Sequence, residues 1–160
     1  MKKISVLALL FTVSTAVFAQ KSNVQNAFRA KEKGNIAEAI EYIEKAAANS
    51  STANDVKMHN YRGEIYFEVH SNAEHAHLDA MAALKCAESW EAVAKHPKAK
   101  KWFDNDDINS KVTKAGVALF NKGVELHSAG NHQGALNLYN KIFDLIPLDE
   151  EGNLSRSNVT

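Results

Sequence analysis

The chain has 160 residues, with 19 Lys and Arg against 19 Asp and Glu, 45% hydrophobic residues, 7 Gly, 2 Pro and 1 Cys. This composition is too apolar for a disordered chain, and too poor in Gly, Pro and Cys for a fibrous or disulfide-stapled one. Balanced charge argues against nucleic acid as the main partner, because phosphate binding requires an excess of cations. Long stretches rich in Ala, Lys and Glu with few helix breakers predict an all-α fold.

Residues 1–19 have the pattern of an export signal. Lys2 and Lys3 give a positive start, an uncharged and mostly apolar run follows, and Ala19 offers a small-residue cleavage site before Gln20. The run is shorter than the roughly 20 residues that span a bilayer, so no stable membrane span is expected in the mature form. We therefore expect an exported chain, soluble after cleavage near Ala19 and either periplasmic or secreted.

Six helices are predicted from apolar residues at helical spacing. Breaks at Gly34-Asn35 and Gly130-Asn131 suit helix ends, since glycine tolerates the left-handed backbone that closes a helix, and Pro147 stops the last one. Asn54 or Asp55 is expected to cap the third helix, and Asn105 or Asp106 the fifth. The expected helices cover about 23–33, 36–47, 56–70, 78–93, 106–126 and 135–143.

Short turns between these helices predict an antiparallel array of about three helix hairpins. The hairpins cover about 22–50, 54–95 and 105–147, within one helical domain over 20–147. The Lys-rich stretch 95–101 is a linker, because Pro97 cannot continue a helix. Residues 148–160 form a polar tail or the start of a further repeat.

The hairpins share an internal pattern. Ala39, Ile43 and Ala46 are four and three residues apart in the first hairpin. The same spacing recurs in the second hairpin at Ala80, Leu84 and Ala87, and in the third at Ala135, Tyr139 and Ile142. This pattern resembles the tetratricopeptide repeat family, which is built from 34-residue helix–turn–helix units. The third hairpin matches the motif most closely, at Gly123, Leu126, Gly130, Ala135, Tyr139 and Pro147. The resemblance covers most of 22–147 and implies an α-solenoid.

No group of residues predicts a catalytic, cofactor or metal site. His70, Glu74, His75 and His77 lie within eight residues and could suggest a metal site. His75 and His77, however, are two positions apart and would face different sides of a helix, which favours a solvated turn. The acidic run 104–107 lacks the Gly and distal Glu of a calcium loop, which favours helix capping. A nucleophile elbow, a phosphate-binding loop and a paired zinc motif are all absent from the sequence. The chain is therefore not expected to be an enzyme.

Three other features have a functional and a structural interpretation. The run 95–101 could bind polyanions, although a solvated helix end is favoured. Trp102-Phe103 could stack on a sugar or base, although anchoring the linker is favoured. Cys86 is placed on the outer side of its helix, where an inert thiol is favoured over a reactive one.

The family resemblance implies a non-catalytic protein–protein interaction module or scaffold of the bacterial cell envelope. In this family partners usually lie in a concave groove built from the first helix of each hairpin. Carrying the motif over gives the groove residues Val24, Phe28, Lys31, Asn60, Glu64, Phe67, Phe120, Asn121, Val124 and His127. The expected partner is an extended or helical protein segment held by apolar contacts, with Asn60 and Asn121 bonding its backbone. A terminal-carboxylate ligand is disfavoured, because this set has no cluster of Lys, Arg and Asn.

Alternatives remain at this point. Phe28, Phe67 and Phe120 could simply pack between hairpins, since burial is the usual place of an aromatic side chain. The chain could instead be the helical scaffold of an outer-membrane-associated ligand-binding protein, for example a glycan-handling one, or of an enzyme whose other domain is missing. The polar tail after Pro147 would leave the last hairpin uncovered, which predicts a longer chain or self-association through the last helix.

Overall fold

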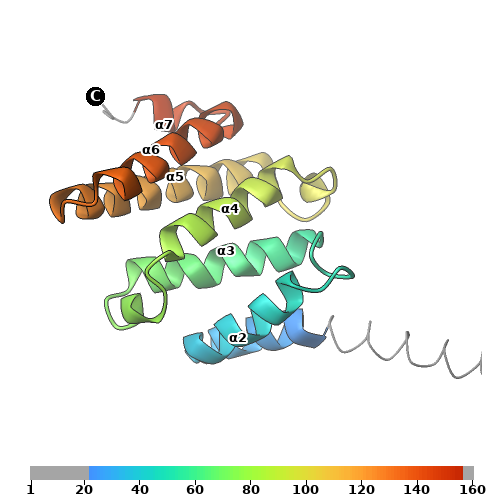
Figure 1. The fold of residues 1–160 in the computed structure, drawn as a ribbon. Coiled ribbons are helices and arrows are strands. Elements are labelled where there is room, and N and C mark those ends of the chain that lie inside the picture. The colour runs from blue at the N-terminus through green and yellow to red at the C-terminus, as the bar shows by residue number, and fades with distance from the viewer. Residues whose placement is uncertain (1–21, 157–160) are drawn as a thin grey trace, which may run out of the picture.

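The computed structural model describes residues 22–156, and all regular secondary structure within them is helical. Figure 1 shows the helices packed in consecutive pairs, with the N-terminal helix and α2 at one end of the stack and α6 at the other. The all-α prediction is confirmed, and the predicted signal 1–19 lies outside the described residues. The elements are the N-terminal helix 22–32, α2 (Ile36–Ala47), α3 (Val56–Ser71), η1 (Ala76–Leu78), α4 (Ala82–Lys95), η2 (Ala99–Lys101), α5 (Asn105–Ser128), α6 (His132–Leu145), η3 (Ile146–Leu148) and α7 (Asn153–Arg156).

The two Gly-Asn breaks fold alike. Gly34 and Gly130 have φ angles of +78° and +81°, the left-handed conformation in which a side chain would be strained. In both turns the asparagine N–H bonds back to the helix just ended, from Asn35 to the Ala30 carbonyl at 2.9 Å and from Asn131 to the Leu126 carbonyl at 2.8 Å. These bonds satisfy carbonyls that a helix end otherwise leaves without partners.

The N-terminal cap of α3 is the predicted residue, whereas that of α5 is not. The Asp55 carboxylate accepts from the Lys57 and Met58 N–H groups, so Asp55 caps α3 as predicted. On α5, however, the cap is Asp104, which accepts from the Asp107 N–H at 2.8 Å, and the expected cap at Asn105 or Asp106 is wrong. The extended backbone that a capping residue needs is found at Asp104, so Asn105 is already the first helical residue.

The second hairpin has a different register from the predicted one. Ala80 is exposed in the turn before α4, whereas Ala83, Ala87 and Trp90 are buried at the spacing of four and three. The turn between α3 and α4 is long and contains η1, and it delays the start of α4 to Ala82. Gly63 of α3 allows the Trp90 indole to pack directly on its backbone, since a Cβ there would lie 2.2 Å from Trp90 Nε1.

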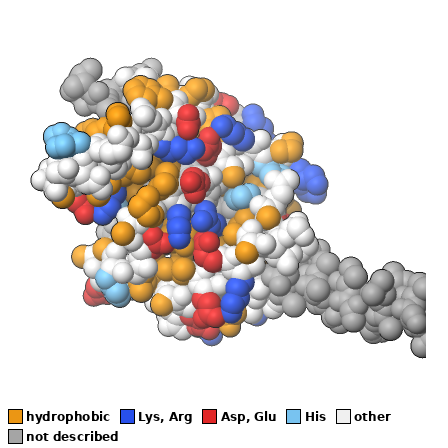
Figure 2. Space-filling view, in the orientation of Figure 1, with side chains coloured by type: hydrophobic (Ala, Val, Ile, Leu, Met, Phe, Trp, Pro, Cys, Tyr) orange, Lys and Arg blue, Asp and Glu red, His pale blue; other side chains and the backbone are white. Residues whose placement is uncertain are grey.

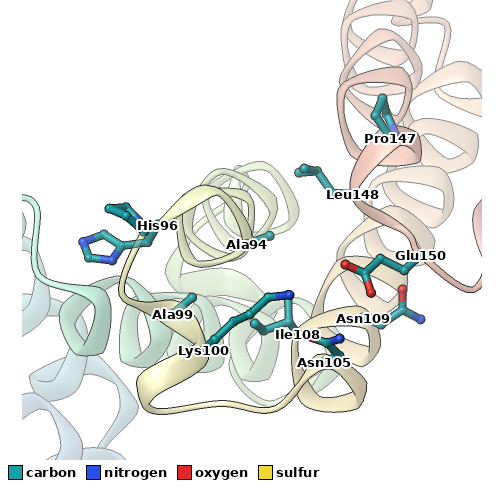
Figure 3. Close-up of a pocket in the computed structure, with 11 residues that line it drawn as sticks. Ala94, His96, Ala99, Lys100, Asn105, Ile108, Asn109, Pro147, Leu148 and Glu150 are labelled. Atoms are coloured by element: carbon teal, nitrogen blue, oxygen red, sulfur yellow. The ribbon is translucent and has the colours of Figure 1, made fainter.

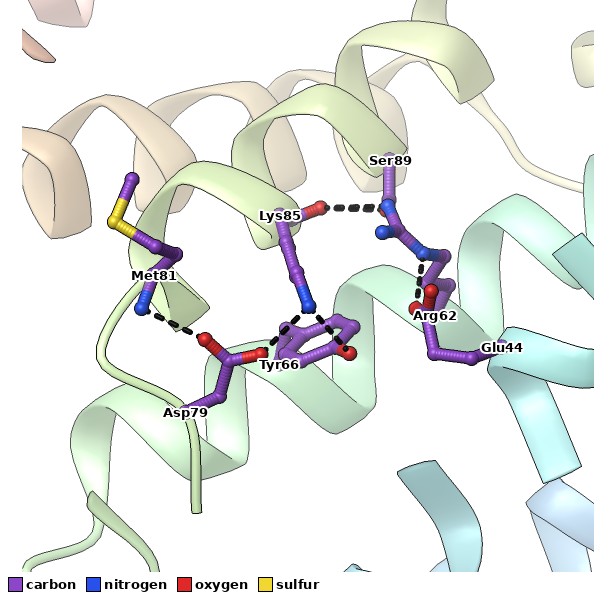
Figure 4. A network of polar contacts seen from close by, with 7 residues as sticks. All are labelled: Glu44, Arg62, Tyr66, Asp79, Met81, Lys85 and Ser89. Atoms are coloured by element: carbon purple, nitrogen blue, oxygen red, sulfur yellow. Dashed lines mark hydrogen bonds and ion pairs between the residues drawn. The ribbon is translucent and has the colours of Figure 1, made fainter. Parts of the chain in front are cut away.

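A polar network joins the first two hairpins (Figure 4). Arg62 of α3 donates to the Glu44 carboxylate of α2 at 2.7 Å and to the Ser89 hydroxyl of α4 at 2.9 Å. Beside it the Lys85 ammonium donates to Asp79 at 2.7 Å and to the Tyr66 hydroxyl at 3.2 Å. Burial raises the pKa of Tyr66 to about 12, so its hydroxyl stays protonated. The network fixes how α2, α3 and α4 sit on one another.

Cys86 lies in the core and not on the outer side of α4, so that expectation is wrong. The side chain is fully buried, and burial raises the pKa of its thiol. The physical reason is that α4 packs against both α3 and α5, so two of its faces are covered. Within residues 22–156, every helix is too short or too polar to cross a membrane.

Candidate partner-binding groove

A groove runs between α3 and α5, which lie side by side in the stack. It consists of two adjoining cavities of about 310 and 440 Å³ that share Phe67 and Lys114. The first cavity is lined by Lys31, Glu64, Phe67, Trp90, Asp107, Ser110, Lys111 and Lys114. The second is lined by Phe67, His70, Ser71, Thr113, Lys114, Val117, Ala118 and Asn121. We call this feature the α3–α5 groove.

Helical spacing explains why these side chains share one wall. On α5, the lining residues Lys114, Val117 and Asn121 are three and four positions apart, which places them on one face of the helix. On α3, Glu64, Phe67 and His70 are each three positions apart, which also places them along one side of the helix. The 24-residue length of α5 matters, because its first half extends the wall toward Lys31 of the N-terminal helix.

The end of the groove near the N-terminal helix is polar. Lys31 donates to the Glu64 carboxylate at 2.7 Å, and the Asn60 amide donates to the other Glu64 oxygen at 2.8 Å. Burial lowers the pKa of Lys31, but the hydrogen bond and charge of Glu64 outweigh it and the pKa is raised overall. Asn60 is buried, so it orients Glu64 and does not itself line either cavity. Lys111 and Lys114 add positive charge across from this pair.

The middle of the groove is apolar. The Phe67 ring packs on the buried Trp90 ring with 5.4 Å between centroids, and Val117 of α5 lies 45% exposed in the neighbouring cavity. His70 lines the same cavity, and burial followed by the nearby Lys122 charge lowers its pKa below the usual 6.5. A neutral imidazole, an aromatic ring and a valine thus form the surface that a bound side chain would contact.

The structure brings together four of the ten predicted groove residues: Lys31, Glu64, Phe67 and Asn121. Val24 is buried in the core, and Asn60 lies behind Glu64. Val124 and His127 are exposed further along α5, beyond the residues that line the two cavities.

The three predicted phenylalanines all stack on another ring. Phe28 lies 4.8 Å from Tyr61 and Phe120 lies 6.1 Å from Tyr139, centroid to centroid, in addition to the Phe67–Trp90 pair. Phe28 and Phe120 therefore pack helices together and line neither cavity. Phe67 does both, because its ring is only partly buried.

Sequence reasoning missed Lys111, Lys114 and Val117. The predicted groove residues of the third hairpin begin at Phe120, so the predicted groove wall leaves out the first half of α5. Spacings of three and four along 107–121 were the available signal. These residues change the charge of the site, because three lysines line the first cavity against Glu64 and Asp107.

Two further hollows contain other residues. One, of about 280 Å³, lies between the 96–100 linker, the start of α5 and η3, and Figure 3 shows Lys100 and Glu150 on its opposite sides. Another, of about 340 Å³ and mostly apolar, lies between the start of α4 and the α5–α6 turn. Neither includes a residue of the predicted set. Within residues 22–156, no group of three or more His, Cys, Asp and Glu could hold a metal ion.

The comparisons with known proteins do not assign a family. No family model, no curated protein and no solved structure matches this chain.

Proposed function

We propose that this chain is a non-catalytic interaction module that binds a segment of another protein in the α3–α5 groove. The observation that supports this is the pair of adjoining cavities, which have an apolar centre at Phe67 and Val117 and polar ends. Two cavities in line suit an elongated ligand, and a small number of placed polar groups around apolar side chains is the usual composition of a binding site.

The groove's chemistry favours a segment with an apolar residue beside an acidic one. The apolar side chain would lie between Phe67 and Val117, and the acidic one would face Lys111 and Lys114. Lys31 is already paired with Glu64, so the two α5 lysines supply the charge for the partner. Asn121, exposed at the edge of the second cavity, can bond the partner's backbone.

The tetratricopeptide-like α-solenoid and the export signal are parts of the same proposal. The paired helices and the shared Gly-Asn turns support the repeat interpretation, and the sequence pattern of 1–19 supports export to the periplasm or the exterior. Intact-mass measurement of the exported material tests the second part. A chain beginning at Gln20 is expected, and retention of 1–19 would contradict it.

Capture of partners from the native cell envelope tests the groove. Immobilised residues 20–160 are compared with a Val117→Asp variant, and captured proteins are identified by mass spectrometry. Val124→Asp is the matched control, because Val124 is 43% exposed on the same helix but lies outside both cavities. We expect Val117→Asp to lose a partner that Val124→Asp retains, with equal helical content by circular dichroism. Equal capture by the two variants would refute the groove assignment.

A further inference from the structure

The outer face of α6 differs from the equivalent faces of α2 and α4. The second helices of the three hairpins, α2, α4 and α6, can be compared at two equivalent positions. The first position directly follows the buried alanine of the repeat (Ala39, Ala83 or Ala135), and the second lies seven residues further along the helix. Ile40 and Ala47 on α2 are partly buried against the core. On α4 the pair is Leu84, also partly buried, and Glu91, whose side chain is 12% exposed. On α6 the pair is Leu136 and Phe143, which are 50% and 67% exposed.

The difference follows from what packs next in the stack. The face of α2 is covered by α3, and the face of α4 by α5. After α6, the described chain supplies only η3 and the short α7, and α7 packs back against α5, where Leu154 lies on Gly116. The next hairpin covers this face on α2 and on α4, but no helix of the described residues covers it on α6.

The open face also has few charges. Its exposed residues are His132, Gln133, Leu136, Asn137, Asn140, Phe143 and Asp144. Apolar anchors surrounded by amides, with charged residues depleted, are the composition of an interface core. The surface over α6, at the upper left of Figure 2, is accordingly mostly hydrophobic or neutral, whereas Lys, Arg, Asp and Glu mingle over the middle of the same view.

We propose that α6 pairs with α6 of a second copy of this chain, in antiparallel orientation about a two-fold axis beside Asn140. This pairing places Leu136 of one copy against Phe143 of the other and Asn140 near its own counterpart. A two-fold contact brings the same patch of both copies together, and amides and apolar groups tolerate this where like charges would repel. Asp144 lies off the axis, so the two Asp144 carboxylates stay apart.

Head-to-tail stacking is the competing arrangement, and the other end of the stack does not complement α6. The exposed residues of the N-terminal helix are Ser22, Gln25, Arg29 and Glu32, all polar. Stacking that helix on α6 would desolvate charged groups against Phe143, which costs free energy without a paired opposite charge. The α6–α6 contact brings in one carboxylate, that of Asp144, which is already paired with Lys141 at 3.2 Å.

Disulfide trapping tests the geometry on residues 20–160. Asn140→Cys is expected to form a covalent dimer under mild oxidation, because a disulfide needs Cα atoms within about 7 Å and Asn140 lies at the axis. Gln133→Cys is the control, equally on the exposed face of α6 but two turns from the axis. The native Cys86 is buried and does not compete. Crosslinking of Gln133→Cys as efficient as that of Asn140→Cys would overturn the proposed pairing.

Sedimentation velocity over a micromolar to millimolar range tests the association itself. Wild type is expected to dimerise with rising concentration, and Phe143→Asp is expected to weaken the dimer at least roughly a hundredfold. Val124→Asp, at a 43% exposed position on α5, should dimerise like wild type. A wild type that stays monomeric throughout, or one that grows into longer assemblies, would overturn the proposal. Partner capture by the groove should be unchanged in Phe143→Asp.

Discussion

The packing of α3 on α4 depends on the absence of a side chain at Gly63. A Cβ at this position would lie 2.2 Å from Trp90 Nε1 and 2.3 Å from Trp90 Cδ1, far inside contact distance. The indole cannot easily move away, because it is buried and packs on Phe67. Gly63→Ala must therefore push the two helices apart or force Trp90 out of its rotamer.

The expected cost comes from two opposing effects. Overpacking a dense core costs about 1–3 kcal/mol, and the rigid buried ring places this site toward the upper end. Alanine is better than glycine in a helix by about 1 kcal/mol, which offsets part of the strain. The net destabilisation is about 2 kcal/mol, and it corresponds to a fall of about 4–8 °C in the melting temperature of a chain of this size.

Urea and thermal unfolding followed by circular dichroism measure this change. Gly116→Ala is the matched control, since its Cβ would lie 2.4 Å from Leu154 Cδ2, the tip of a flexible side chain on the short α7. Leu154 can rotate away, so Gly116→Ala should stay within about 1 kcal/mol of wild type. A Gly63→Ala protein as stable as wild type would show that the described packing of Trp90 on α3 is wrong.

Three further outcomes are expected. Burial lowers the pKa of both His59 and His70 below 6.5, so these imidazoles bind protons more readily in the unfolded chain than in the folded one. The free energy of unfolding should therefore fall as the pH drops below 6.5, and thermal melts of His70→Gln should show a weaker dependence on pH. Cys86 should resist thiol reagents in the folded protein and react at the rate of unfolding, as a time course in urea can show. Lys141→Met should lower the free energy of unfolding by at most about 1 kcal/mol in urea melts near neutral pH, because Glu91 keeps its second partner, Lys95. Burial raises the pKa of Glu91, but the hydrogen bonds and charges of Lys141 and Lys95 lower it overall.

Local signals in the sequence were sufficient for most of the helices and for the two Gly-Asn turns. The Gly-Asn turns and the Asp55 cap depend on residues a few positions apart, so their structure follows from the immediate sequence. The pattern of Ala39, Ile43 and Ala46 likewise predicted one face of α2, and all three residues are buried.

The remaining differences arise from tertiary structure. The shift of α4 to Ala83, Ala87 and Trp90 depends on how many residues the η1 turn uses, which periodicity does not encode. Burial of Cys86 needs a helix covered on two faces, and a single amphipathic stripe does not reveal the second face. The groove lysines of α5 were missed because they lie before Gly123, where the third hairpin begins to match the motif.

Site-specific photocrosslinking in cells tests the central claim, partner binding in the α3–α5 groove, most directly. A photoreactive amino acid replaces Val117 inside the groove or, as a control, Glu88 on the exposed face of α4. Our account predicts a discrete crosslinked protein from position 117 that is absent from position 88. The same crosslinked protein from position 88, or none from position 117, would contradict it.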